Sequence, residues 1–153
     1  SVIITLYVAR NIARCIKSLD GVADDVMVMD SDSTYGTQQI AADLGAKVMP
    51  TKWEGYATTK NKAYEQVNGE YILWLDADEA LSVELRESIK AVKEGLTGAY
   101  QINRLNNYRG TWLKHGGLYP DRKVRLFPKG KAEWKGNLVH EELVLDSGIA
   151  KKQ

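Results

Sequence analysis

Cysteine and long apolar runs are what this sequence of 153 residues has least of. A single cysteine, Cys15, excludes an internal disulfide and fits a reducing compartment. No apolar run approaches the roughly 20 residues that a membrane-spanning helix needs. The N-terminal SVIITLYVAR has neither the basic region nor the small-residue cleavage site of a signal peptide. We therefore expect a cytoplasmic protein.

The net charge of +1 conceals opposite charges in two parts of the chain. Residues 1–99 hold 10 lysines and arginines against 15 acidic residues, whereas residues 100–153 hold 11 against 5. The basic second part predicts an anionic partner, such as a phosphate group or an anionic surface. The aromatic residues interleaved there also suit nucleic acid. For any one residue, a solvated basic face is an equally good explanation.

Strand and helix patterns alternate through the first two-thirds of the chain. Nearly continuous apolar runs predict strands, and apolar residues at helical spacing predict helices. The expected strands are 2–8, 25–30, 46–50 and 71–76, and the expected helices are 11–19, 37–44, 56–67 and 82–93. Short βα repeats of this kind predict an α/β fold with a mostly parallel, doubly wound sheet and helices on both faces.

Particular residues have expected places in this scheme. Cys15 lies at helical spacing from core positions and should be a small buried hydrophobe. Gly45 should end the second helix in the left-handed conformation. In the fourth helix, capped by Ser82, the side chains expected to point inward are Val83, Ile89 and Val92. After Gly98, strands at 99–103, 123–127 and 137–145 predict a mixed-strand extension of the same sheet.

Acidic residues directly follow two of the expected strands. DVMVMD ends in Asp30, and YILWLD leads into Asp76, Asp78 and Glu79. Ligands of open parallel sheets bind beyond the carboxyl ends of the strands. Asp76 and Asp78 can together hold a divalent cation, or divide between a metal and a hydroxyl. The alternative is that such acids only form a turn, which we expect for Glu79 and which explains Asp30 equally well.

Several short motifs follow one another in a fixed order: DSDSTYGT, WEGY, LDADE, HGGLYPD, RLF and VHEE. In this order they resemble the inverting family-two glycosyltransferases of GT-A fold. The sequence is most similar to the branch that includes lipopolysaccharide-core β-glucosyltransferases. The resemblance covers nearly the whole chain. It implies one domain over 1–153, with a nucleotide-sugar-binding half at 1–98 and an acceptor-side half at 99–153 that ends early.

The resemblance also implies an activity and its partners. A sugar moves with inversion from a nucleotide-diphosphate donor, foremost a UDP-sugar, to a hydroxyl of a glycan or lipid-linked acceptor. Mg²⁺ or Mn²⁺ would neutralise the leaving diphosphate. Nucleic acid is not an expected partner. A membrane-borne acceptor and the basic second part predict peripheral contact with the inner face of the cytoplasmic membrane.

Residue roles carry over from the motifs of this family. Asp78 is expected to hold the metal, and Asp76 the ribose or the metal shell. Asp30 is expected to meet the base or ribose of the nucleotide. Lys60, in KN, and Arg125, in RLF, are expected to reach the diphosphate.

Direct displacement also needs a base that takes the acceptor proton. Glu141 is the first choice because a carboxylate in the His-Glu motif is usual in this family, and Asp121 is the second. Alternation along a strand points Glu141 away from His140 and Glu142. His140 is expected to be structural, and Asp121 can equally cap a turn.

Other charged and aromatic residues have weaker expectations. Arg104 and Arg109 are expected to be surface charges. The aromatic rings of Trp112, Tyr119 and Trp134 can stack on a sugar, although as isolated aromatics they are better explained by packing.

Departures from the family pattern keep two alternatives open. Leu6-Tyr7-Val8 stands where the branch has Lys-Asn-Glu, Tyr35 replaces an aspartate and Asp32 a glycine, and the chain stops at Gln153. A truncated or degenerate domain would bind a nucleotide, a glycan or a protein partner without turnover. A nucleotidyltransferase is the other alternative, but SVIITLYVARN contains no glycine for a phosphate loop.

Overall fold

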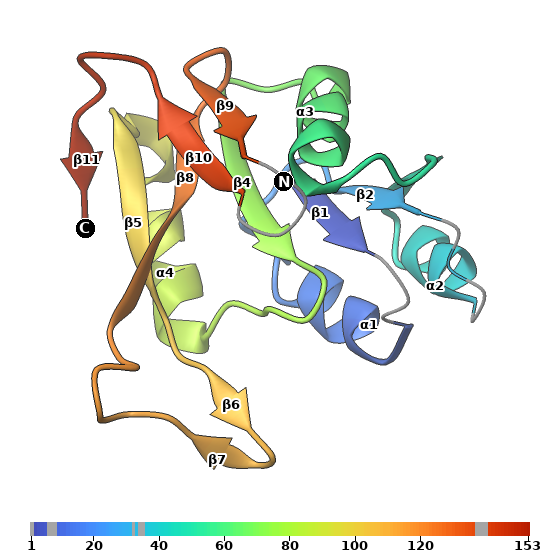
Figure 1. Ribbon diagram of the computed structural model, residues 1–153, viewed down its shortest axis with the longest axis horizontal. Coiled ribbons are helices and arrows are strands. Elements are labelled where there is room, and N and C mark those ends of the chain that lie inside the picture. The colour runs from blue at the N-terminus through green and yellow to red at the C-terminus, as the bar shows by residue number, and fades with distance from the viewer. Residues whose placement is uncertain (1, 6–8, 32, 34–35, 137–140) are drawn as a thin grey trace.

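The computed structural model describes residues 2–5, 9–31, 33, 36–136 and 141–153 (Figure 1). Its helices are α1 (Ala9–Lys17), α2 (Thr37–Asp43), α3 (Tyr56–Gln66), α4 (Val83–Val92) and the 3₁₀ turn η1 (Lys93–Gly95). Its strands are β1 (Val2–Thr5), β2 (Met27–Asp30), β3 (Lys47–Pro50), β4 (Tyr71–Asp76), β5 (Ala99–Arg104), β6 (Asn107–Tyr108), β7 (Thr111–Trp112), β8 (Asp121–Pro128), β9 (Ala132–Lys135), β10 (Glu142–Leu145) and β11 (Lys151–Lys152).

A seven-stranded mixed sheet in the described part of the chain has the order β11-β5-β8-β4-β1-β2-β3. Strands β1 to β4 run parallel, and β8 is antiparallel to both of its neighbours, β4 and β5. From β1 the chain builds outward to β2 and β3 on one side, and then returns to place β4 on the other side. The gap between the carboxyl ends of β1 and β4 is therefore the topological switch point at which ligands of such sheets bind.

Hydrophobic cores lie on both faces of the sheet, as the α/β prediction requires. Side chains alternate along β4, so Leu73 and Leu75 face the core under α1, α2 and α4. Ile72 and Trp74 face the opposite core, which α3 and the β9–β10 hairpin cover. Cys15 is fully buried in the first core, as predicted.

Local signals placed most helix ends correctly. Gly45 has a φ of 82°, the left-handed conformation expected after α2. The Ser82 hydroxyl accepts a hydrogen bond from the backbone N–H of Leu85 and caps α4. The inward prediction for Val83 and Val92 was wrong, since Val83 is 67% exposed and Val92 is also exposed. The core-facing stripe of α4 runs through Leu85 and Ile89.

The chain beyond Gly98 extends the same sheet, as expected, but its details differ from the prediction. The expected strand 137–145 is seen as β10 from Glu142 onward, and β6, β7 and β9 were not predicted. His140, Asp32, Tyr35 and the Leu6-Tyr7-Val8 segment lie outside the described residues. Gly98 packs so closely against β11 that a Cβ there would lie 2.5 Å from the carbonyl oxygen of Ala150. Within the described ranges, no helix has the length and apolarity needed to cross a bilayer.

Candidate active site

The acidic residues singled out in the sequence gather at one edge of the sheet. Asp76, the last residue of β4, is in register with Ile4 of β1, and Asp30, the last residue of β2, is in register with Thr5. Because β1, β2 and β4 are parallel, their carboxyl ends share this edge. Asp30 and Asp76, both expected at the carboxyl ends of strands, therefore lie at the same edge of the sheet.

A tight turn follows Asp76 and fixes the acids after β4. The Glu79 backbone N–H donates to the Asp76 carbonyl oxygen at 2.9 Å, and the Asp76 N–H donates to Glu79 Oε2 at 3.1 Å. Arg14 Nη2 donates to the Asp78 carbonyl oxygen at 2.6 Å, while the Asp78 residue is exposed. Burial raises the pKa of Cys15 to about 12, so its thiol stays protonated and donates to the Asp76 carbonyl oxygen at 3.8 Å.

The Asp76 carboxylate lies between two buried cations. Arg125 Nη2 is 2.8 Å from its Oδ2, and Lys60 Nζ is 3.5 Å from its Oδ1. Burial alone would raise the pKa of Asp76, but the charges of Arg125 and Lys60 outweigh it and hold the pKa below its ordinary value of 3.8. Likewise, burial would lower the pKa of Arg125, but Asp76 and Glu79 raise it instead. Arg125 is thus held charged, facing Asp76.

Glu141 contacts Lys60 and so joins these charged side chains. The ring of Trp134 packs against the ammonium group of Lys60. Glu141 Oε1 is 2.9 Å from Lys60 Nζ, and Lys60 Nζ also lies 4.2 Å from the centre of a Trp134 ring. Trp134 is buried and packs at 5.1 Å against Trp74. The packing interpretation of Trp134 is confirmed, and its role is to form the wall beside Lys60.

Glu79 and Arg104 connect these charged side chains to Asp121. Glu79 Oε1 is 2.5 Å from Arg125 Nη2 and 3.5 Å from Arg104 Nη1. Arg104 donates to Asp121 Oδ2 from Nε at 2.8 Å and from Nη2 at 2.6 Å, and Lys123 Nζ is 3.5 Å from Asp121 Oδ1. Arg104 is partly exposed, as expected of a surface charge, but β5 also directs it towards Asp121 and the turn after β4. Arg109 is exposed, as predicted.

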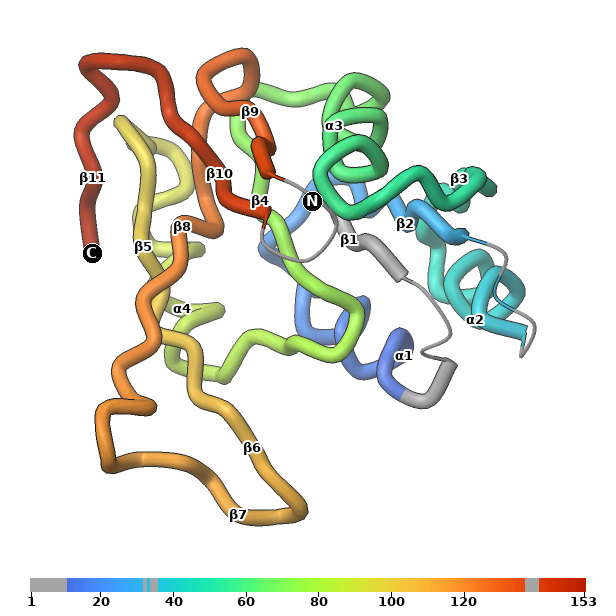
Figure 2. The backbone as a smooth tube through the Cα atoms, viewed as in Figure 1, coloured from blue at the N-terminus to red at the C-terminus, as the bar shows by residue number. Residues whose placement is uncertain are grey.

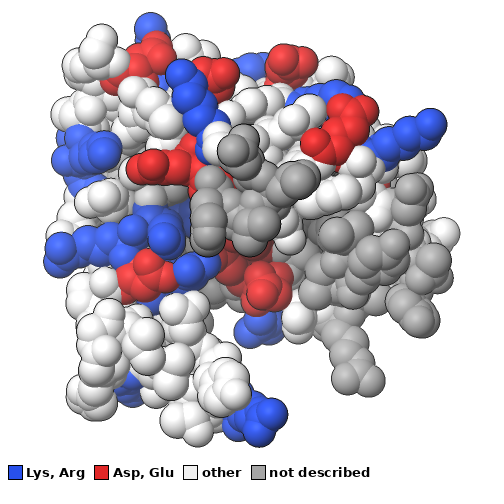
Figure 3. Space-filling model, in the orientation of Figure 1, with Lys and Arg blue, Asp and Glu red and all other residues white. Residues whose placement is uncertain are grey.

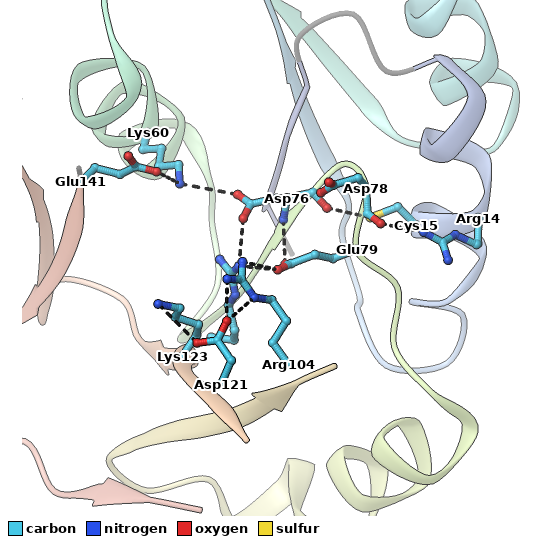
Figure 4. Close-up of polar contacts among 11 residues, drawn as sticks. Arg14, Cys15, Lys60, Asp76, Asp78, Glu79, Arg104, Asp121, Lys123 and Glu141 are labelled. Atoms are coloured by element: carbon cyan, nitrogen blue, oxygen red, sulfur yellow. Dashed lines mark hydrogen bonds and ion pairs between the residues drawn. The ribbon is translucent and has the colours of Figure 1, made fainter. Parts of the chain in front are cut away.

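These contacts form one chain of side chains whose charges alternate in sign, shown in Figure 4 and called the ionic network below. Its members, in order of contact, are Glu141, Lys60, Asp76, Arg125, Glu79, Arg104, Asp121 and Lys123. Sequence analysis did not identify Glu79, Arg104 or Lys123 as members of this network. The Asp76-x-x-Glu79 spacing of the turn was the available signal for Glu79, whereas nothing local pointed to Arg104.

Asp121 is poorly suited to take a proton in this arrangement. Burial would raise the pKa of Asp121, but the hydrogen bonds and charge of Arg104 lower it below 3.8, with a further contribution from Lys123. A base works best when its pKa lies near the working pH. The lowered pKa of Asp121 therefore counts against Asp121 as the base.

Asp30 is fully buried at the end of β2. Its Oδ2 accepts hydrogen bonds from the Ser33 N–H at 3.2 Å and from Gln38 Nε2 at 2.7 Å. The contact with Ser33 is the turn that the sequence suggested. The other oxygen, Oδ1, is buried without a hydrogen-bond partner among the described residues. Because an unsatisfied buried carboxylate oxygen is costly, this atom is ready to accept a hydrogen bond from a ligand.

The acidic turn is suited to a cation that binds together with a phosphate group. It does not provide a complete set of protein ligands for a metal ion among the described residues. No cluster of three or more histidine, cysteine or acidic side chains suited to a metal occurs within the described ranges. Both Asp76 oxygens face cations, whereas Asp78 is exposed at the turn. Mg²⁺ in proteins commonly uses one or two carboxylates together with substrate phosphates. Asp78 is suited to be such a ligand.

Acid is expected to destabilise the chain partly through Asp76. Because the folded pKa of Asp76 is lowered, its ion pairs stabilise the fold fully above pH 3.8, and this contribution is lost as the pH falls through the lowered folded value. The free energy of unfolding, measured by urea titration at pH 7 and pH 3, should fall less in Asp76→Asn than in the wild type. Asp20→Asn, at an exposed position, controls for the loss of one acid. Equal acid sensitivity in Asp76→Asn and the wild type would contradict this account.

Comparison with known proteins identifies relatives of this chain. The family model described as Glycosyl transferase family 2 matches residues 1–142. An uncharacterized glycosyltransferase of Rickettsia bellii is 41% identical, over 96% of this chain and 52% of its own length. The lipopolysaccharide core biosynthesis glycosyltransferase LpsC of Rhizobium meliloti is 31% identical, over 96% of this chain and 57% of its own length. The chain thus spans about half the length of these curated relatives.

Solved structures show the same fold. Residues 1–349 of TarS from S. aureus superpose with a TM-score of 0.55 at 22% identity, over 74% of this chain and 36% of that TarS fragment. The predicted GT-A fold is confirmed, and so is the family suggested by the motifs. This chain belongs to glycosyl transferase family 2.

Proposed function

We propose that this chain binds a nucleotide-diphosphate sugar and transfers the sugar, with inversion, to a hydroxyl of a glycan or lipid-linked acceptor. The observation that supports this proposal most directly is the position of the acids. Asp76 ends β4 at the switch point, Asp78 follows in the next turn, and Asp30 ends β2 at the same edge of the sheet. The names of two similar proteins support the proposed classes of donor and acceptor. TarS was solved in complex with UDP-GlcNAc, and LpsC is a lipopolysaccharide core enzyme. A UDP-sugar and a lipopolysaccharide-type acceptor are therefore our first choices.

In this proposal, the nucleotide and the diphosphate use different ends of the site. Oδ1 of Asp30, which has no hydrogen-bond partner among the described residues, accepts a hydrogen bond from the base or ribose. Asp78, with Asp76 beside it, would hold Mg²⁺ or Mn²⁺ together with the diphosphate. When bound, that cation supplies charge neutralisation for the leaving diphosphate.

Lys60 links donor binding to the base. In the donor-free chain its ammonium group contacts both Asp76 and Glu141. A donor diphosphate that takes Lys60 as a partner would release Glu141. Glu141 then takes the proton from the acceptor hydroxyl as the acceptor oxygen bonds to the anomeric carbon. The bond from that carbon to the diphosphate breaks, and the diphosphate keeps the electron pair.

The buried partner of Asp76, Arg125, serves to position it. Arg125 contacts Asp76 and Glu79, which lie at the two ends of the turn. This double contact holds the turn that carries Asp78. Arg125 is therefore proposed to act on the diphosphate mainly by positioning the turn. It would contact the diphosphate directly only if its ion pair with Asp76 or Glu79 broke.

Titration calorimetry of UDP with Mn²⁺ present or chelated tests the donor site. The wild-type chain should bind UDP more tightly with Mn²⁺, and Asp78→Asn should lose this gain, by about tenfold or more, because a carboxylate ligand is replaced by a neutral one. Asp20→Asn removes an exposed acid elsewhere and should bind like the wild type. Equal binding of UDP with and without Mn²⁺, or unchanged binding by Asp78→Asn, would contradict the metal role of Asp78.

A further inference from the structure

The segment between β5 and β8 projects from the body of the protein. Figure 2 follows the backbone out along β6 and back along β7, away from the sheet and its helices. We call this segment, residues 105–120, the 105–120 hairpin. Pairing of Tyr108 with Thr111 closes its tip, and the Leu113 N–H donates to the Asn106 carbonyl oxygen at 2.9 Å. The projection is therefore an ordered element.

The 105–120 hairpin exposes apolar and aromatic side chains that serve no core. Tyr108 is 63% exposed, Trp112 52% and Leu118 52%, and both Leu105 and Tyr119 are also exposed. None of these five residues belongs to either hydrophobic core as described. Single exposed apolar residues are ordinary, but five on one projecting element indicate an interaction surface.

The charge of the 105–120 hairpin has one sign only. Its sequence, LNNYRGTWLKHGGLYP, contains no aspartate or glutamate. Arg109 and Lys114 on the hairpin are exposed, and so is Arg122 at its base. In Figure 3 the projecting lower part of the molecule is mostly uncharged, with lysine and arginine but no acidic residue at its tip.

We propose that the 105–120 hairpin docks on the surface of a lipid bilayer that contains anionic lipids. Tyrosine and tryptophan have an apolar body and a polar tip, and they are enriched where a membrane meets water. Basic residues nearby are attracted by anionic headgroups. Exposed aromatic rings together with arginine and lysine, and without any acidic residue, are complementary to such a surface. Binding to a protein partner would give no reason for all the charged residues of the hairpin to be basic.

The position of the hairpin connects this surface to the proposed reaction. Strands β5 and β4 run in the same direction, because each is antiparallel to β8. The hairpin therefore leaves the sheet at the edge where Asp76 ends β4. At its base, Arg104 and Asp121 bind each other, and Arg104 also contacts Glu79 of the acidic turn. A membrane under the hairpin would bring a lipid-linked acceptor to the edge that holds the site. This last step rests on the proposed function, but the docking does not.

Vesicle co-sedimentation tests the proposal without any donor or acceptor. The wild-type chain should sediment with vesicles of phosphatidylcholine and phosphatidylglycerol, and much less with phosphatidylcholine alone. Tyr108→Ser/Trp112→Ser should weaken binding by roughly tenfold or more through loss of buried apolar area. Arg109→Gln/Lys114→Gln should weaken it by about fivefold for each charge.

Matched controls distinguish vesicle binding through the hairpin from nonspecific adsorption to vesicles. Trp53→Ser removes an exposed tryptophan beyond β3, at the far end of the sheet, and Lys17→Gln/Lys47→Gln removes two exposed lysines at the opposite edge. Both controls should bind like the wild type, and all variants should keep the wild-type melting temperature. No binding to either vesicle, equal binding to both, or full binding by the hairpin variants would overturn the proposal. UDP titration of the same variants should be unchanged, so failure of docking and failure of the donor site are distinguishable.

Discussion

Replacing Glu141 with glutamine is expected to slow sugar transfer by roughly 10²–10⁴-fold, the usual contribution of a general base. Glutamine keeps the size of the side chain and its contact with Lys60 but cannot accept the proton of the acceptor hydroxyl. Metal-dependent UDP binding should persist, because the donor contacts at Asp30 and Asp78 are untouched. The measurement is the initial rate of radiolabelled glucose transfer from UDP-glucose to core-truncated lipopolysaccharide.

Asp121→Asn is the matched control for this prediction. Asp121 is the second candidate base, but Arg104 and Lys123 hold its carboxylate. Its loss should slow transfer far less than the loss of Glu141. A larger effect of Asp121→Asn, or an unchanged rate in Glu141→Gln, would assign the base elsewhere. A wild-type chain that binds UDP but transfers no sugar would favour binding without turnover.

Replacing Arg125 with methionine is expected to lower the free energy of unfolding by about 3 kcal/mol. Arg125 is buried and is the cation nearest to both Asp76 and Glu79, at 2.8 and 2.5 Å. Methionine fills much of the volume but leaves two carboxylates facing each other without that cation. The loss should shrink at low pH, where the carboxylates are protonated. Urea unfolding at pH 7 measures the effect.

Arg122→Met is the control for this variant. Arg122 lies on the same strand but is exposed, so its replacement should change the free energy of unfolding by no more than about 0.5 kcal/mol. Arg125→Lys should fall between the two, since lysine restores the charge but not the two-sided contact of the guanidinium. Equal stability of Arg125→Met and the wild type would show that the ionic network does not support the fold.

Elements and their order were predictable where a local pattern was long enough. The six residues of YILWLD, bounded by a turn and by acids, indicate a buried strand, and the structure has β4 at 71–76. Strands β6 and β7 have two residues each, too few for alternation to show. In α4 the helix and the inward position of Ile89 were predicted correctly, but the inward positions of Val83 and Val92 were not, because valines cannot be ranked as core residues without knowing where the sheet lies.

The candidate site was predictable as a location but not as a set of contacts. Only one residue separates Asp76 from Asp78 in the sequence, so predicting the end of one strand was enough to place both. The partners of Asp76 come from α3 and β8, and Lys60 and Arg125 meet there only through tertiary packing. Family motifs named these two residues as diphosphate ligands. Only the structure shows that their charges face carboxylates.

Strand β8 lies between β4 and β5, although it follows both in the chain. Until β8 is synthesised, β4 has an unpaired edge, with the backbone groups of Tyr71, Ile72 and Leu73 open to any other strand. Exposed edges of this kind promote association between chains. A fragment that stops at Gly98 would therefore keep every acid proposed for the donor and yet be prone to aggregate. The proposed division into a donor half and an acceptor half would be one of chemistry, whereas folding joins residues 1–98 and 99–153 through the middle of one sheet.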